Sequence, residues 1–402
     1  MGSSPDTFHT VLDRSGTSSY KWDYRPTNSA GRQLLPMWIA DMDFPAAPVI
    51  QEALAERVEH PVYGYTFASD RYRSTFVEWQ RARNGWSIGD EALLYAPGVM
   101  PAVRAAILAF SEPGDEVVVQ TPVYFPFFSA IRDNGRTVLE NPLVNVDGRY
   151  EMDLDRLESS ISPRTRLLLL CSPHNPVGRV WTRPELERLD ALCARHGLLV
   201  IADEIHSDLT RSGIDFVPYA DVSSQAAART IAAHSPSKTF NIAGIASAHL
   251  VVPNDDLRVR LESTLSRLGM TIPNALSLSA TEAAYGAGGA WADSLLEFLD
   301  GQIEWFGAEM DRRFTGEILC SPIEGTYLAW LDFRRLYERT GADDAAARHA
   351  LVEEAALRLS DGSRFGADGR GFFRMNLAAP RRLVEDGLER LERAVSYLEQ
   401  KQ

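Results

Sequence analysis

The chain has 402 residues, 45% of them hydrophobic, and its 41 basic and 55 acidic side chains give a formal net charge of −14. The apolar content is ordinary for a globular protein and too high for a disordered one, and the length suggests two or three domains. The negative charge argues against nucleic acid as a main partner, because neutralising phosphates requires a basic face. No apolar stretch reaches the roughly 18 residues of a membrane span, so we expect no membrane partner.

The N-terminal residues and the cysteines indicate in which cellular compartment we expect the protein. Residues Met1 to Asp6 have neither the basic nor the apolar region of a signal peptide. The cysteines, Cys171, Cys193 and Cys320, are odd in number and far apart, which favours a reducing compartment over a disulfide framework. Histidines and cysteines follow no metal-ligand spacing, so we expect no metal. We therefore expect a cytoplasmic protein.

In the central part of the chain, helical patterns alternate with short apolar runs. Three continuous apolar runs bounded by turn residues predict buried strands, at residues 116–120, 166–171 and 198–202. Helical patterns occupy residues 101–110 and 184–196, and Thr182 and Gly197 are a candidate N-cap and C-terminal stop for the second. This rhythm predicts right-handed βαβ units and a mostly parallel sheet sandwiched by helices.

The last quarter of the chain has a different pattern. A long helical pattern at 291–313 precedes a hairpin-like segment at 325–330 and two charged amphipathic helices, 343–360 and 381–400. This order predicts a smaller α+β domain. We expect an α/β protein in three parts, which are an N-terminal arm that joins the small domain (1–47), a large domain (48–288) and a small C-terminal domain (289–402).

Polar side chains follow three successive predicted strands. Asn175 lies after the strand at 166–171, Asp203 after the next one, and Lys238 after an apolar run at 230–233. In open α/β sheets, ligands bind outside the carboxyl ends of the strands. An amide, a carboxylate and an amine together suit a pyridine aldehyde, because the amine can bind the aldehyde carbon while the carboxylate keeps the ring nitrogen protonated.

Lys238 stands out because lysine is rare in this chain. Of the 41 basic residues only Lys21, Lys238 and Lys401 are lysines, and the rest are arginines. Arginine could not replace an aldehyde-binding lysine, because its guanidinium stays protonated. The alternative is a surface lysine, but surface positions in this chain are filled by arginine.

The three loops contain the segments HNPVGR (174–179), ADEIHSD (202–208) and SPSKTFNIAG (235–244). In combination they resemble the fold type I pyridoxal-phosphate enzymes of the aminotransferase class I/II superfamily. Further segments resemble the MalY/PatB-type C–S β-lyases, the cystathionine β-lyase and cystalysin group, namely WIADMDF (38–44), YGYT (63–66), PVYFPF (122–127) and GFFRMNLAAPR (371–381). The resemblance covers nearly the whole chain in the family's order.

The resemblance implies roles around the pyridoxal ring. Lys238 would bind the aldehyde and then move the substrate α-proton, and Asp203 would pair with the ring nitrogen, although an Asp after a strand is also a common N-cap. Asn175 would bind the ring hydroxyl and the substrate carboxylate, although Asn-Pro is also a turn starter. His206 would contact the ring hydroxyl or be a turn histidine. Tyr124 would stack on the ring or be a core tyrosine.

The cofactor phosphate is expected at the start of the helix at 101–110. Backbone N–H groups of Gly98, Val99 and Met100 precede this helix, where the helix dipole and unpaired amides attract an anion. The hydroxyls of Ser235 and Ser237 could add hydrogen bonds.

The substrate and a second chain complete the implied site. Arg374 would clamp the α-carboxylate of an amino-acid substrate, with Trp38 and Ala40 in the wall of the site. Tyr65, or Tyr63 two residues earlier, would reach the phosphate of a neighbouring chain. Such a role requires a C2 homodimer with shared active sites.

Several residues near these motifs are assigned no role in the chemistry. We assign no site role to three arginines, Arg179, Arg364 and Arg370. Glu204 and Cys171 are interpreted as structural residues. Ala246 stands where typical aminotransferases of the superfamily have a phosphate-binding arginine, and the lyase subgroup also lacks that arginine.

The resemblance implies a C–S β-lyase that cleaves cystathionine or another cysteine S-conjugate to thiol, pyruvate and ammonia. Three alternatives stay open. One is an aminotransferase using the same residues, the second is a decarboxylating or oxidatively deaminating variant, and the third is a regulatory binding protein that keeps the fold. The presence of Lys238, Asp203 and Asn175 argues against an inactive protein, while a second function stays open.

Overall fold

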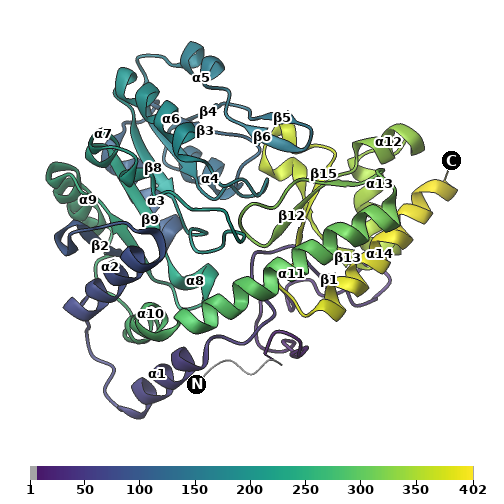
Figure 1. The fold of residues 1–402 in the computed structure, drawn as a ribbon, viewed down its shortest axis with the longest axis horizontal. Helices are drawn as coiled ribbons and strands as arrows, with labels where there is room; N and C mark the ends of the chain where they lie inside the picture. The colour runs from purple at the N-terminus through teal and green to yellow at the C-terminus, as the bar shows by residue number, and fades with distance from the viewer. Residues whose placement is uncertain (1–6, 402) are drawn as a thin grey trace.

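The computed structural model describes residues 7–401, and its largest element is a seven-stranded sheet (Figure 1). The strands lie in the order β2 (Leu93–Ala96), β10 (Ala248–Val251), β9 (Thr230–His234), β8 (Leu199–Asp203), β7 (Thr165–Cys171), β3 (Glu116–Val119) and β4 (Thr137–Glu140). Every pairing is parallel except the two made by β10. The predicted α/β class with a mostly parallel sheet is confirmed.

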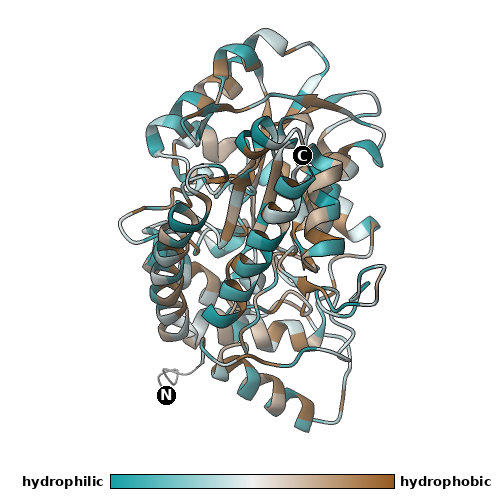
Figure 2. Ribbon diagram, turned by 90° about the vertical axis from the view of Figure 1, so that its right-hand side faces the viewer, coloured by the Kyte–Doolittle hydropathy of each residue, from teal (hydrophilic) through white to brown (hydrophobic). Residues whose placement is uncertain are grey.

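Helices cover both faces of this sheet, which explains why its strands are apolar throughout. Along β3, Val117 and Val119 belong to one core while Val118 belongs to the other, as the two-residue period of a strand requires. The first core contains α3 (Val99–Phe110), α4 (Pro126–Arg132) and α9 (Asp255–Arg267). The second contains α2 (Asp70–Asn84), α6 (Arg183–His196), α10 (Ala275–Ala287) and the start of α11 (Gly289–Phe314). Figure 2 shows these strands largely brown between helices with teal outer faces.

Local signals set the ends of the helices that precede the site. The Glu185 carboxylate accepts hydrogen bonds from the Thr182 N–H and hydroxyl at the start of α6, and Gly197 ends that helix with φ 64°. Helix α3 begins at Val99, two residues before the predicted start, directly after Gly98 with φ 137°. The first N–H groups of α3 therefore lie at the carboxyl end of β2.

Shorter elements complete the large part of the molecule. Helix α1 (Pro48–Glu59) packs on α10, and β5 (Val144–Val146) pairs with β6 (Arg149–Glu151) as a separate hairpin. The remaining short helices are α5 (Leu154–Ser160), α7 (Ser224–Ala228) and α8 (Pro236–Thr239).

A second, smaller sheet lies in the C-terminal part (Figure 1). Its antiparallel order is β11 (Leu319–Cys320), β12 (Leu328–Asp332), β15 (Phe372–Asn376) and β14 (Ser360–Asp361), packed against α12 (Arg334–Thr340), α14 (Arg381–Gln400) and the end of α11. The smaller α+β domain is thus confirmed as an architecture. The boundaries at 47 and 288 stay a prediction, since α11 contributes Trp291 to the large core and Phe306 to the small one.

The predicted helix at 343–360 is wrong in its second half. Helix α13 (Asp344–His349) continues only as a π-helical turn, Ala350–Glu354, and strands β13 (Leu357–Arg358) and β14 follow. Ala356 has a left-handed φ of 54°, and Leu357 pairs with Leu35 of β1 (Leu35–Pro36). Pairing with the distant N-terminal arm therefore overrides the local helical pattern.

Within residues 7–401, no helix is long and apolar enough to cross a bilayer.

Candidate active site

One cavity of about 840 Å³ opens at the carboxyl ends of β7, β8 and β9, between the large sheet and the small one. It has lining residues from the N-terminal arm, the strand-end loops and the segment that ends in β15. All but one of the predicted site residues line it, namely Trp38, Ala40, Gly98, Val99, Met100, Tyr124, Asn175, Asp203, His206, Ser235, Ser237, Lys238 and Arg374. The exception is Tyr65.

Lys238 lies on the one-turn helix α8, directly after β9. Its Nζ donates a hydrogen bond to the Ala40 carbonyl at 2.5 Å, which ties the loop to the N-terminal arm. Burial lowers the pKa of Lys238 to about 8, against the opposing effect of the Asp41 and Asp203 charges. A larger share of this amine is therefore unprotonated at neutral pH than in an ordinary, solvated lysine.

Asp203 ends β8 and is buried, and its strand pairs with Cys171 of β7 on one side and Ala233 of β9 on the other. Its carboxylate accepts a hydrogen bond from the Ile205 N–H at 3.2 Å, and no cation lies within ion-pair distance among residues 7–401. Burial raises the pKa of Asp203 to about 7. A carboxylate held this way favours a positively charged ligand, because a cation would repay its desolvation.

The start of α3 offers donors for an anion. No side chain caps this helix, so its first N–H groups, those of Val99 and Met100, have no intrahelical acceptor, and both residues line the cavity. The Ser235 hydroxyl donates to the Ser247 carbonyl at 2.7 Å and lies 2.9 Å from the Ser237 hydroxyl. Amides and hydroxyls with a helix dipole behind them form a phosphate site.

Arg374 of β15 and Asn175 of the β7 loop meet across the cavity. Arg374 Nη1 donates to Asn175 Oδ1 at 2.7 Å, and Nη2 donates to the Trp38 carbonyl at 2.9 Å. Both acceptors are neutral, so the guanidinium keeps its charge for a ligand. Burial lowers the pKa of Arg374 to about 10, which still leaves it protonated at neutral pH.

Two aromatic side chains complete the part of the cavity formed by the large sheet. Burial raises the pKa of the Tyr124 hydroxyl, so this phenol stays protonated at neutral pH. His206 is buried, its Nδ1 has no partner within the described residues, and burial lowers its pKa well below the usual value. A neutral imidazole with a free ring nitrogen can bind a hydroxyl of a ligand.

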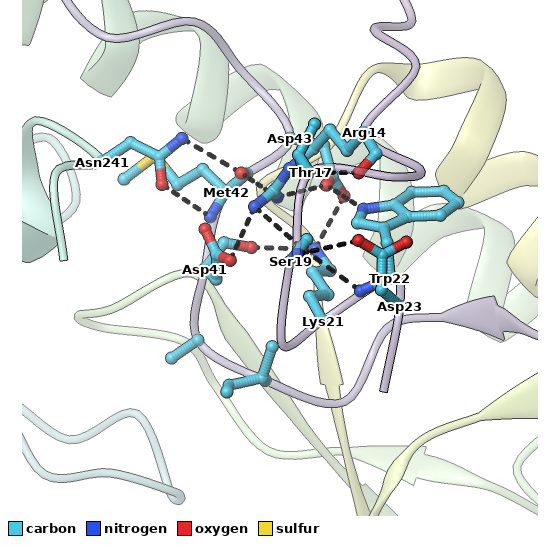
Figure 3. Close-up of polar contacts among 12 residues, drawn as sticks. Arg14, Thr17, Ser19, Lys21, Trp22, Asp23, Asp41, Met42, Asp43 and Asn241 are labelled. Atoms are coloured by element: carbon cyan, nitrogen blue, oxygen red, sulfur yellow. Dashed lines mark hydrogen bonds and ion pairs between the residues drawn. The ribbon is translucent and has the colours of Figure 1, made fainter. Parts of the chain in front are cut away.

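A charged network holds the N-terminal arm in the wall of the cavity (Figure 3). Arg14 pairs with Asp41 and Asp43 at 2.8 Å, and buried Lys21 pairs with Asp43 at 2.6 Å. The Asn241 amide, three residues after Lys238, donates to the Met42 carbonyl at 3.0 Å. The arm is thereby bound to the loop that contains the amine.

The structure corrects one expectation and adds residues that motif reasoning missed. Arg364, treated as background, lines the cavity and stacks on Phe125, with its guanidinium carbon 3.9 Å from the ring centroid. Arg14 and Tyr20 of the arm line the cavity as well. Their positions depend on contacts between distant segments, and no local pattern marks them.

Other residues without an expected role are packed into the framework. Buried Arg179 pairs with Glu185 and Glu324, each at 2.8 Å. Glu204 is not among the residues that line the cavity, and its carboxylate accepts from the Tyr219 N–H at 2.7 Å and lies 2.9 Å from His234. Ala246 lines the cavity, so no arginine side chain enters it from that position.

Tyr65 lies outside the cavity of its own chain. It is 96% exposed, and exposed apolar neighbours in the same extended segment are Val62, Tyr63 and Phe67. Within the described chain, Tyr65 therefore has no place in the site.

The residues present fit pyridoxal phosphate. The unpaired, buried Asp203 carboxylate suits a protonated ring nitrogen, and the uncapped start of α3 suits a phosphate. The partly deprotonated amine of Lys238 suits an aldehyde. No three histidine, cysteine, aspartate or glutamate side chains gather as a metal site would require anywhere in residues 7–401.

The comparison with known proteins agrees with this geometry. Residues 40–391 match the family Aminotransferase class I and II. Cystathionine beta-lyase PatB of Bacillus subtilis is 38% identical over 96% of this chain and 98% of its own, and Protein MalY of Escherichia coli is 36% identical over the same shares. The crystal structure of cystalysin from Treponema denticola, which contains pyridoxal 5'-phosphate, superposes with a TM-score of 0.93 at 35% identity, covering 97% of this chain and 99% of that one.

A match over most of the chain, together with a cavity whose residues agree with the motifs, shows that this chain belongs to the aminotransferase class I and II family.

Proposed function

We propose that the chain is a pyridoxal-phosphate-dependent C–S β-lyase that cleaves a cysteine S-conjugate. The observation that supports this most is the joint placement of Lys238, Asp203 and the Arg374–Asn175 pair around one cavity. The PatB and cystalysin relatives, similar over nearly the whole chain, favour the same activity.

In this proposal each side of the cavity binds a different part of the reacting system. Gly98, Val99, Met100, Ser235 and Ser237 hold the phosphate of the cofactor. The remaining contacts hold the ring, with Asp203 at the ring nitrogen, Tyr124 against its face, and His206 and Asn175 near its hydroxyl. When bound, pyridoxal phosphate withdraws electrons from the substrate Cα, which makes the Cα proton acidic.

The chain's own residues then direct the elimination. Arg374 and Asn175 hold the substrate α-carboxylate, with Trp38 and Ala40 in the wall beside it. Lys238 Nζ, which holds the cofactor aldehyde before substrate arrives, takes the proton from Cα. The Cβ–S bond breaks as the thiolate leaves, and one water is consumed, so each substrate yields one thiol, one pyruvate and one ammonia.

Amino transfer on the same residues is the competing outcome. The presence of Ala246 where transferring members of the superfamily have an arginine disfavours it, and so does the similarity to Cystathionine beta-lyase PatB. The two reactions differ in their products, because transfer requires a 2-oxo acid acceptor and releases no thiol.

A single assay separates these outcomes. The holoenzyme is incubated with a panel of cysteine S-conjugates, with and without a 2-oxo acid, while thiol, pyruvate and transferred amino groups are measured together. The proposal expects thiol and pyruvate in equal amounts without an acceptor. Turnover that depends on the 2-oxo acid and releases no thiol would establish a transferase instead.

We further propose a cytoplasmic C2 homodimer. The exposed apolar side chains around Tyr65 support a dimer interface at that segment. The cytoplasmic location is supported by Cys171, Cys193 and Cys320, which are free thiols. In such a dimer Tyr65 would bind the cofactor phosphate of the partner chain. Tyr65→Ala should then weaken cofactor binding several-fold. For the wild-type protein, light scattering should give twice the mass of one chain. A monomer in solution would refute the shared site.

A further inference from the structure

The mouth of the cavity holds a cation that nothing in the proposed chemistry uses. Arg364 lines the cavity, and no carboxylate of residues 7–401 lies within ion-pair distance of it. The nearby acidic groups are engaged elsewhere, because Asp361 pairs with Arg348 at 2.7 Å and Asp368 accepts a hydrogen bond from Thr121 at 3.1 Å. The guanidinium is therefore available to a ligand.

Packing fixes the position of this guanidinium. It stacks on the Phe125 ring, whose centroid lies 5.6 Å from that of Phe365, and Arg374 lies 5.0 Å over the Phe365 ring. The two guanidinium groups are thus linked through two packed aromatic rings, of which Phe125 lines the cavity. Arg374 is buried beside Asn175 whereas Arg364 is exposed, so Arg364 lies nearer the opening of the cavity.

Two other arginines, Arg358 and Arg374, are close enough to interact with the charge of Arg364, although the chain as a whole carries a formal charge of −14. The Arg358 guanidinium stacks on Trp38, 4.0 Å from the ring centroid. Burial, and then the charges of Arg25 and Arg364, lower the pKa of Arg358. Arg358 itself is engaged, because its Nη1 donates to the Tyr24 carbonyl at 2.7 Å. Cations beside a cleft attract an anionic ligand and hold it more weakly in high salt.

We propose that Arg364 forms a distal subsite for an acidic group at the far end of the substrate. The preferred substrates are then cysteine S-conjugates whose sulfur substituent ends in a carboxylate, with the α-carboxylate on Arg374 and the distal one on Arg364. This assignment rests on the proposed lyase function and adds the class of substituent to it. Conjugates with a neutral end of the same size should bind more weakly.

The test compares two substrates of nearly equal shape. S-(2-carboxyethyl)-L-cysteine and S-(2-carbamoylethyl)-L-cysteine differ in one terminal group, a carboxylate against an amide. For wild-type holoenzyme we expect kcat/KM to favour the acid by about fivefold, mostly through KM, which is the size of a partly exposed ion pair. The preference should shrink at about 1 M salt.

Variants assign this preference to one side chain. Arg364→Gln should bring the acid-to-amide ratio of kcat/KM close to one, because kcat/KM for the acid falls more than that for the amide. Arg370→Gln, an exposed arginine in the same segment that does not line the cavity, should keep the wild-type ratio. Equal use of both substrates by wild type, or a preference that survives in Arg364→Gln, would overturn the subsite.

A binding measurement separates failure of the subsite from failure of the lyase proposal. L-2-Aminopimelate has the chain length of the acidic conjugate but no sulfur to eliminate, so calorimetry with it needs no turnover. It should bind wild type about fivefold more tightly than Arg364→Gln. If no conjugate releases thiol but this difference holds, the lyase proposal fails and the anionic subsite stands. Equal binding refutes the subsite even when thiol is released.

Discussion

The two walls of the cavity are held in place by different means. On one side, Asn175, Asp203 and Lys238 follow neighbouring parallel strands, and the register of the sheet fixes their spacing. On the other side, residues more than 300 positions apart in the chain are joined by hydrogen bonds. Asn376 donates to the Ile39 carbonyl at 2.7 Å, and Arg374 donates to the Trp38 carbonyl at 2.9 Å.

This difference suggests that the two walls have different roles. The sheet side holds the groups that react with or charge the cofactor, on a framework that is buried on both faces. The arm side holds the substrate and depends on the polar network of Arg14, Lys21, Asp41 and Asp43. Substitutions on the sheet side should therefore abolish chemistry without unfolding the protein, whereas those in the arm network should act through stability.

Lys238→Ala should have the largest effect on turnover. We expect thiol release to fall by more than about 10³-fold, because the amine that takes the Cα proton is gone. The unfolding midpoint should change little. Burial already disfavours the charged form of this amine, so removing the amine sacrifices little stability. The matched control is Lys401→Ala, at the surface near Tyr397, which should be fully active. Retained activity in Lys238→Ala would remove the basis of the proposed mechanism.

Asp43→Asn should have the largest effect on stability. Asp43 accepts from Arg14, Lys21 and Trp22, and the Lys21 side chain is only 1% exposed, so the substitution leaves a buried ammonium without its counter-ion. We expect the free energy of unfolding to drop by about 3 kcal/mol, measured by denaturant titration. Asp13→Asn, on an exposed arm residue, should leave the midpoint unchanged. An unchanged midpoint in Asp43→Asn would show that the network does not hold the arm.

Asp203→Asn should reduce turnover by about 10²-fold, less than loss of the amine. The amide keeps the shape of the side chain but provides no negative charge for the ring nitrogen. Steady-state thiol release measures the effect, and Asp221→Asn, on a surface carboxylate paired with Arg183, is the control. Wild-type turnover in Asp203→Asn would place the ring nitrogen elsewhere.

The pH dependence of cofactor attachment should show the smallest effect, about tenfold per pH unit over a limited range. Burial lowers the pKa of Lys238 to about 8, so Nζ loses its proton as the pH rises through that value. The rate at which apo-protein binds the cofactor, followed by absorbance, should therefore rise up to about pH 8 and then level off. A rise that continues to about pH 10 would indicate an ordinary, solvated lysine.

The sequence alone could predict the sheet wall, because strand, loop and motif are contiguous there. Asn175, Asp203 and Lys238 each follow an apolar run that forms a strand of the sheet. On the other wall the motifs identified Arg374, Trp38 and Ala40, but Arg14, Tyr20 and Arg364 could not be found in this way. Arg364 lies in the turn that follows β14, a strand whose Ser360 hydroxyl donates to the Trp38 carbonyl of the arm. The second half of the predicted helix at 343–360 becomes strands that pair with the arm and with β15.

The scarcity of lysine allows a direct test of the central claim, that the chemistry is built on Lys238. Holoenzyme is reduced with borohydride to fix the bound cofactor, digested, and mapped by mass spectrometry for a pyridoxyl group on each of the three lysines, Lys21, Lys238 and Lys401. We expect one group per chain, on the peptide that contains Lys238. A label on the peptide of Lys21 or Lys401, or none on that of Lys238, would contradict this account of the active site.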